Sequence, residues 1–423
     1  MKFKLYNSVE ITHSTPLNFD HSVGFHDVRP FNKYKNNLVL LHRYPLNNIG
    51  FKSKINLPIE ICIWDISKKK IDKIDQTDAW SWEQGSRLQW INENELIYNI
   101  KNGNNLSSCI YNIKSKKKKI LENTVYSINH NYNYLHINFE RLWKLWRSYG
   151  YKNSGNLNGY NKEPEDDGIF ICDFNNNKKL LLSIKDAVKL CGLVGLNKDF
   201  FLCHPTFNPS GNKFVSLLRF FNDTGALISY FICTDIKTNK SQVLAREKVS
   251  HFEWIQDEKI VVWSRNINQN LAKLRLNSFI EKNIISKIKL VLNFATKSFK
   301  SKILSTSYHL IDLKNLKKIT KLSKDSLNED GHPQISPNKR FLITDTYANN
   351  HKYQKLLLYD LKRNEVYILG EFRLDNYLTN VNLKYDLHPR WDNTGNLICI
   401  DSSHDGSRQT YILNIEKLLR KIN

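Results

Sequence analysis

The sequence has no motif of nucleotide or serine-hydrolase chemistry. It lacks a G-x-x-x-x-G-K-[ST] loop, a G-x-G-x-x-G turn after a strand, an H-E-x-x-H helix and a G-x-S-x-G elbow. It also lacks an apolar run long enough to span a bilayer, and its N-terminal segment MKFKLYNSVEITHSTPLNFD does not contain the unbroken apolar core of a signal peptide. We therefore expect a cytoplasmic protein without a membrane span.

Paired cysteines are also missing. The seven cysteines are odd in number, and no two of them have the CxxC spacing of a zinc or redox site. Several lie in apolar, strand-like runs, where a free thiol behaves as a small core residue. This usage favours a reducing compartment.

Acidic residues are scarce relative to basic ones. The chain has 63 Lys and Arg against 41 Asp and Glu, a formal charge of +22, which favours polyanionic partners such as nucleic acid, anionic lipid or acidic polysaccharide. Much of the excess is Lys in runs such as 68–70 and 116–119, in a chain rich in Asn, Ile and Lys. A solvated surface is an equally good interpretation. Nucleic acid is the disfavoured partner, because only the net charge points to it.

One short pattern recurs seven times. It is an apolar, β-rich run followed by Asp or Asn, one apolar residue and a polar turn, as in ICIWDISKKK and LLLYDLKRNE. Its Asp or Asn residues are Asp65, Asn112, Asp173, Asp235, Asp312, Asp360 and Asn414. Two further strand candidates precede each copy, and one usually follows it. The pattern predicts an all-β fold, a seven-bladed β-propeller that forms a single domain over residues 1–423.

The repeat also predicts where the blades lie. We expect them at approximately 12–78, 79–123, 124–190, 191–247, 248–325, 326–375 and 376–423. The last segment is short of one strand, and strand 1–11 supplies apolar residues at every second position that complete this blade and close the ring. The longest gap predicts an insertion at 266–303 in blade five, and 147–168 is expected to form a long loop.

Four of the 13 histidines stand at the same place in the repeat, just before the first strand of four successive blades: His204, His251, His332 and His388. Equivalent positions in a propeller face the same end of the channel, so these imidazoles should converge. Neutral imidazoles suit a divalent metal such as Mn, Fe, Ni or Zn, and one left free could serve as a general base. Asp330 and Asp386 could orient His332 and His388. The competing interpretation is a His-Pro pair that only starts a strand.

Cationic and aromatic residues at strand ends form a second group. Arg side chains bind carboxylates through two nitrogens, and aromatic rings stack on sugars, so such a group suits an acidic sugar. Ordinary surface arginines and core aromatics remain the alternative. The predicted substrate-binding residues are His42, Arg43, Arg147, Tyr151 and Arg265, with Arg141, Arg219, Tyr149, Trp143 and Trp146 as further members of the group.

The stretches CHPTFNPSGNKFVSLLRFF, GHPQISPNKRFLITDTY and DLHPRWDNTGNLICIDSSHDGSRQTYIL resemble seven-bladed propellers of the oligogalacturonate-lyase group, which are related in architecture to ulvan lyases. His-Pro blade starts also occur in TolB-like propellers. The resemblance implies that His204 is the general base and that His251, His332 and His388 hold a divalent metal such as Mn or Zn. It also implies an arginine that neutralises the uronate carboxylate, a role for which only location favours Arg219 or Arg141. Independently of the resemblance, a Tyr can donate a proton, and Tyr149 is the candidate for this catalytic role.

Three hypotheses for function follow. The first is a carbohydrate-active propeller that binds an acidic oligo- or polysaccharide at a His-rich channel mouth and cleaves it by metal-assisted β-elimination. The second is a non-catalytic propeller that binds a glycan or protein partner in surface-polysaccharide metabolism. The third, a basic scaffold for nucleic acid, has the least support. The sequence leaves open whether the chain is an enzyme and what its oligomeric state is.

Overall fold

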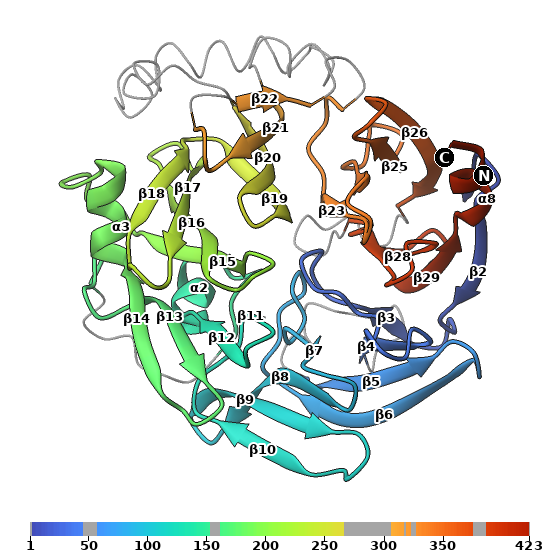
Figure 1. The fold of residues 1–423 in the computed structure, drawn as a ribbon. Coiled ribbons are helices and arrows are strands. Elements are labelled where there is room, and N and C mark those ends of the chain that lie inside the picture. Colours follow the sequence, from blue (N-terminus) through green and yellow to red (C-terminus); the bar gives the residue numbers. More distant parts are fainter. Residues whose placement is uncertain are drawn as a thin grey trace. The chain divides into compact units, whose positions relative to one another are not determined.

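The chain folds as a seven-bladed β-propeller (Figure 1), as its repeats predict. The computed structural model describes residues 2–44, 57–152, 161–265, 306–316, 319–322, 327–374 and 386–422. The insertion predicted at 266–303 lies outside the described residues, as does part of the loop predicted at 147–168.

The first three sheets follow chain order. The first contains β3 (Asp20–Ser22), β4 (Leu38–Tyr44), β5 (Ile59–Asp65) and β6 (Lys70–Thr77). The second contains β7 (Gln89–Trp90), β8 (Glu95–Asn102), β9 (Asn105–Asn112) and β10 (Lys118–Leu121). The third contains β11 (Ser127–Ile128), β12 (Asn133–His136), β13 (Gly168–Asp173) and β14 (Lys178–Ser183). Each is a four-stranded sheet, as expected of a propeller blade.

The next two sheets repeat this arrangement. The fourth contains β15 (Phe201–Phe207), β16 (Lys213–Phe221), β17 (Leu227–Asp235) and β18 (Ser241–Ala245). The fifth contains β19 (Val249–Gln256), β20 (Lys259–Arg265), β21 (Thr306–Asp312) and β22 (Ile319–Lys321). The three helices of the described part are α2 (Phe139–Leu145), α3 (Ile184–Cys191) and α8 (Glu416–Ile422).

The last two sheets both include a strand from the N-terminus. The sixth contains β23 (Gln334–Ile335), β24 (Phe341–Asp345), β25 (Tyr353–Asp360), β26 (Glu365–Arg373) and, at its edge, β1 (Phe3–Leu5). The seventh contains β27 (Arg390–Trp391), β28 (Leu397–Ser402), β29 (Gln409–Asn414) and β2 (Glu10–Ser14). Closure by an N-terminal strand is therefore confirmed, but Glu10–Ser14 completes the last blade while Phe3–Leu5 extends the sixth. Asn7 and Ser8, with φ of 54° and 60°, form the turn between them.

The repeated Asp or Asn accepts backbone N–H groups of the segment that follows the third strand of each blade. In the first blade, the carboxylate of Asp65 accepts hydrogen bonds from the backbone N–H groups of Ser67 and Lys68. The same side-chain acceptor serves the turns after Asn112, Asp173, Asp235, Asp312 and Asp360, and Asn414 accepts the backbone N–H of Glu416 at the start of α8. Because a short side-chain acceptor satisfies backbone donors that the turn leaves unpaired, the pattern recurs once in each blade.

Apolar layers hold neighbouring blades together. One cluster joins strands of the sixth and seventh blades, including Leu356 and Ile398, to α8, and the N-terminal residues Phe3 and Ile11 pack against it. Others join the seventh blade to the first and the first to the second. All seven cysteines are free and buried, as their apolar context predicts. In the described part of the chain, no helix is long and apolar enough to cross a membrane.

Contacts divide the chain into two compact units. The first contains Met1–Asn158, Ile171–Lys179 and His332–Asn423, and the second contains Gly159–Phe170 and Leu180–Gly331. His332 and His388 belong to the first unit, and His204 and His251 belong to the second. Convergence of all four histidines, and a single domain over the whole chain, stay predictions.

Candidate functional site

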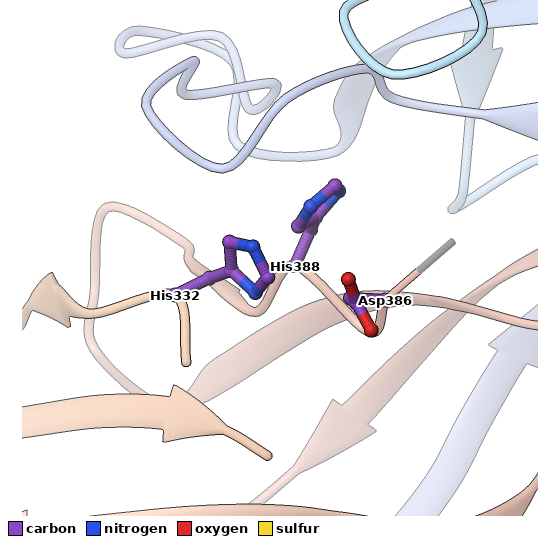
Figure 2. Close-up of side chains that lie close together, drawn as sticks. All are labelled: His332, Asp386 and His388. Atoms are coloured by element: carbon purple, nitrogen blue, oxygen red, sulfur yellow. The ribbon is translucent and has the colours of Figure 1, made fainter. Parts of the chain in front are cut away.

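Two of the predicted histidines and one aspartate lie together in the first unit. His332 precedes β23, while Asp386 and His388 precede β27, and Figure 2 shows their side chains close to one another. One candidate ligand atom from each of the three lies within 4.8 Å of the other two. The rings of His332 and His388 meet edge to face, with their centroids 4.2 Å apart. The side chains therefore present two imidazoles and a carboxylate to one small volume.

A buried carboxylate, Asp345 at the end of β24, fixes both histidines. Its Oδ1 accepts the backbone N–H of His332 at 2.8 Å and lies 2.8 Å from Nδ1 of the same residue. Its Oδ2 accepts the backbone N–H of His388 at 3.0 Å. Since a carboxylate only accepts, Nδ1 of His332 carries a proton, and Nε2 is the nitrogen through which this ring would bind a metal. A histidine that binds a metal through Nε2 carries its proton on Nδ1 in this way.

His388 is held in a strained and desolvated position. Its side chain is 1% exposed, and neither ring nitrogen has a hydrogen-bond partner among the described residues. Its φ of 43° lies in the left-handed region, which costs a non-glycine residue about 1–2 kcal/mol. Burial is the largest cause that holds the pKa of His388 well below its ordinary value. A neutral imidazole with unsatisfied nitrogens is suited to binding a cation.

Asp386 supplies the negative charge of the cluster. Its Oδ1 accepts a hydrogen bond from Nε2 of Gln354 at 2.8 Å, and the residue is half-buried. The sequence predicts Asp386 as a positioning partner for His388, whereas the structure places its carboxylate among the candidate ligands. Two imidazoles and one carboxylate fit Mn, Fe, Co or Zn, so the residues present fit the divalent metal expected from the sequence.

The predicted role of Asp330 is wrong. Its Oδ1 lies 3.1 Å from Nδ1 of His251, and its Oδ2 accepts the hydroxyl of Ser250 at 2.6 Å. Asp345 takes the place at His332 that the sequence assigns to Asp330. The reason is that Asp345 ends the second strand of the blade that His332 begins, a neighbour across the sheet and not along the chain. The role of His251 as a metal ligand stays a prediction.

The second unit brings the predicted base and the predicted arginine together. His204 and Arg219 are buried on the neighbouring strands β15 and β16, and Nη1 of Arg219 lies 3.4 Å from Nε2 of His204. Nε of Arg219 donates to the hydroxyl of Ser229 at 2.9 Å. Arg265, at the end of β20, is also buried.

The predicted aromatic and cationic residues of the first unit are divided between two environments. Tyr149 stacks on Trp146 with ring centroids 3.7 Å apart, and it contacts the ring of Phe25 edge to face at 5.9 Å. Phe25 in turn contacts the ring of His388 at 5.2 Å, so Tyr149 lies one ring away from the cluster. The guanidinium of Arg147 lies over Trp143. Arg141 is buried on α2.

The remaining predicted substrate-binding residues are engaged inside the protein. Tyr151 is fully buried, stacks on Phe139 and accepts a hydrogen bond from Asn99. His42 is fully buried, and burial lowers its pKa to about 3. Arg43 pairs with Glu60. Burial of His42 and Tyr151 argues against direct contact with a substrate.

Sequence reasoning missed His26, on the loop after β3. Its ring centroid lies 5.1 Å from that of His332 and 6.1 Å from that of His388. It also missed Asp345. The ITD ending of β24 is the only signal that could have singled out Asp345, and no local pattern marks His26 because its neighbours in space are about 300 residues away in sequence.

No family model matches the sequence, and no curated protein matches it. Solved structures do resemble it. Oligogalacturonate lyase from Vibrio parahaemolyticus is 9% identical, with a TM-score of 0.59 over 97% of this chain and 96% of that chain. The fold is that of the oligogalacturonate-lyase propellers. The tricorn protease is 11% identical, with a TM-score of 0.52 over 97% of this chain and 34% of that chain.

An oligogalacturonate lyase in complex with manganese is also similar, at 10% identity over 99% of this chain and 97% of that chain, but its TM-score is only 0.43. A lyase and a protease share this fold, so the likeness extends to architecture alone and the function must be argued from the site.

Proposed function

We propose that the chain is a carbohydrate-active β-propeller that binds an acidic oligosaccharide and cleaves it by metal-assisted β-elimination. The observation that carries this proposal is the cluster of His332, Asp386 and His388, with candidate ligand atoms within 4.8 Å of one another. Its donor set suits Mn²⁺, Zn²⁺ or a similar ion. The fold similarity to an oligogalacturonate lyase and the charge of +22 both favour an acidic sugar as the substrate.

β-Elimination from a uronate needs a base and a cation. The base removes the proton on the carbon next to the carboxylate, the electron pair forms a carbon–carbon double bond, and the glycosidic oxygen leaves with a proton from an acid. A divalent metal bound by the cluster would attract the uronate carboxylate and offset the charge that develops on it. His332 and His388 would bind that ion as neutral imidazoles, and Asp345 fixes the backbone of both residues.

We assign the base to His204. Its Nε2 faces Arg219, whose guanidinium is itself suited to a carboxylate. Tyr149, stacked on Trp146 next to Phe25, is the proposed proton donor to the leaving oxygen. A cytoplasmic location would make the substrate a short, imported oligosaccharide.

The alternative is a propeller that binds such a glycan without cleaving it. The burial of His42 and Tyr151 removes two predicted substrate contacts from both versions, so the two are separated by an assay of cleavage.

The test begins with metal content. The purified full chain is expected to hold one divalent ion, measured by elemental analysis, and His388→Ala is expected to lose it. His130→Ala, on an exposed turn, is the matched control and should keep the ion. Incubation with oligogalacturonate should then produce the near-ultraviolet absorbance of an unsaturated uronate.

Two results would count against the proposal in different ways. A chain that binds oligogalacturonate in calorimetry but yields no absorbance, with the metal present, would favour the non-catalytic alternative. A wild-type chain that takes up no stoichiometric Mn²⁺ or Zn²⁺ would remove the metal site altogether.

A further inference from the structure

His26 lies beside the candidate metal cluster although it belongs to the first blade. The loop from Val23 to Val28 follows β3 and places the His26 ring 5.1 Å from His332 and 6.1 Å from His388, centroid to centroid. The side chain is buried, with the residue 4% exposed. Three imidazoles from the first, sixth and seventh blades therefore lie close together.

The spacing of these rings can be compared with that expected around a shared ion. Two imidazoles bound to one metal through nitrogens at about 2.0–2.1 Å have their centroids roughly 4.5 Å apart for a right angle at the metal and roughly 5.2 Å apart for a tetrahedral angle. The three observed separations are 4.2, 5.1 and 6.1 Å. They bracket the expected values, and the His26 ring would have to move toward the cluster of His332, Asp386 and His388, whose candidate ligand atoms lie within 4.8 Å of one another, to share the ion.

The loop is tied to the strands that carry the other two histidines. Gln334, two residues after His332, donates through Nε2 to the carbonyl of His26 at 3.2 Å. Arg390, two residues after His388, donates to the carbonyls of Phe25 and Gly24. His332 and His388 are each followed, two residues later, by a side chain that anchors the loop of His26. This arrangement holds the backbone of His26 in a fixed position relative to the pair.

A second anchor lies on the other side of His26. Asp27 forms two hydrogen bonds with the guanidinium of Arg87, at 2.8 and 2.9 Å, and Arg87 is 1% exposed. The φ of Gly24 is +92°, and a Cβ there would lie 3.1 Å from the carbonyl of Gln84, so this turn requires glycine. Buried donors on both sides and a required glycine are costly features for a loop whose only task is to connect two strands.

We propose that His26 is a third imidazole ligand of the metal site and that it sets the preference of the site for Zn²⁺ over Mn²⁺. The inference rests on the proposed metal site of His332, Asp386 and His388. Adding a nitrogen donor strengthens the binding of Zn²⁺ more than the binding of Mn²⁺, because Mn²⁺ prefers oxygen ligands. Without His26, the set of two imidazoles and a carboxylate would discriminate less between the two ions.

The test measures metal affinity and not activity. The full chain is stripped with a chelator and titrated separately with Zn²⁺ and Mn²⁺ by calorimetry, for wild type, His26→Ala and His26→Gln. Loss of a partner that only orients a ligand costs about 10–100-fold in affinity, so loss of the ligand itself should cost at least about 100-fold for Zn²⁺ and less for Mn²⁺. His130→Ala is the control that removes an exposed imidazole.

Two further readouts separate ligation from a structural role. The visible absorption of bound Co²⁺ should shift in both His26 variants, because it reports the number of nitrogen donors. The rise in melting temperature on adding Zn²⁺ should shrink, and the metal-free melting temperature shows whether each variant is folded. His26→Gln keeps a polar side chain and so guards against a folding defect in His26→Ala.

The outcomes distinguish this inference from the proposed function. Wild type that binds one ion, with an unchanged Zn²⁺/Mn²⁺ affinity ratio and an unchanged Co²⁺ spectrum in both variants, would overturn the role of His26 and leave the metal site standing. Wild type that binds no ion stoichiometrically would overturn both.

Discussion

Replacing Asp345 by Asn should damage both the stability of the first unit and its metal site. The carboxylate is fully buried, and it accepts the backbone N–H groups of His332 and His388 as well as the Nδ1 proton of His332. Asparagine has almost the same shape but replaces one acceptor oxygen with an amide donor. Whichever way the amide turns, at least one N–H must face another.

The expected loss of stability follows from the number of hydrogen bonds that each carboxylate oxygen of Asp345 accepts. Oδ1 serves two donors of His332 and Oδ2 serves one of His388, so the variant should turn its nitrogen toward His388. It then loses one charge-assisted bond, worth about 1.5–3 kcal/mol, and weakens two others, for a total of about 2–4 kcal/mol. Domains are stable by only about 5–15 kcal/mol, so the change is large.

Urea unfolding of the metal-free protein measures this loss, and a separate Zn²⁺ titration should show affinity lower by about 10–100-fold. Asp166→Asn, at an exposed position, is the control and should change neither quantity. A metal-free Asp345→Asn variant whose unfolding free energy stays within about 0.5 kcal/mol of wild type would refute the argument that this carboxylate organises the site.

Two other predictions concern the fold as a whole. Stability should fall as the pH drops below about 6.5, because burial lowers the pKa of His21 to about 4 and of His42 to about 3, and only the unfolded chain then takes up these protons. The loss of stability is about 2 kcal/mol per histidine at pH 5. Asp20 offsets part of it, because burial raises the pKa of this carboxyl to about 6. Equal urea midpoints at pH 7.5 and pH 5 would contradict the prediction. Deleting residues 1–14 should lower the melting temperature and cause aggregation, because it exposes the edges of β26 and β29. Adding a peptide of residues 1–14 should restore the melting temperature and reduce the aggregation measured by light scattering.

The sequence alone was sufficient for the architecture of this protein. The Asp or Asn that ends each third strand caps a turn locally, so its seven copies report seven blades without any knowledge of long-range contacts. The same periodicity placed His332 and His388 at equivalent positions before β23 and β27, which is why their proximity could be predicted. Alternating apolar residues near the N-terminus likewise indicated a closing strand.

Only the tertiary structure decided which side chains complete the site. His26, Asp345 and Asp386 reach the cluster by packing between blades and by pairing across a sheet, and neither relation leaves a spacing in the sequence. The tertiary structure also determines burial. Tyr151 and His42 are residue types that often bind sugars, but both lie in the interior. Local hydrogen bonding recurs with each blade and can be read along the chain, whereas contacts between residues 300 positions apart depend on how the blades pack.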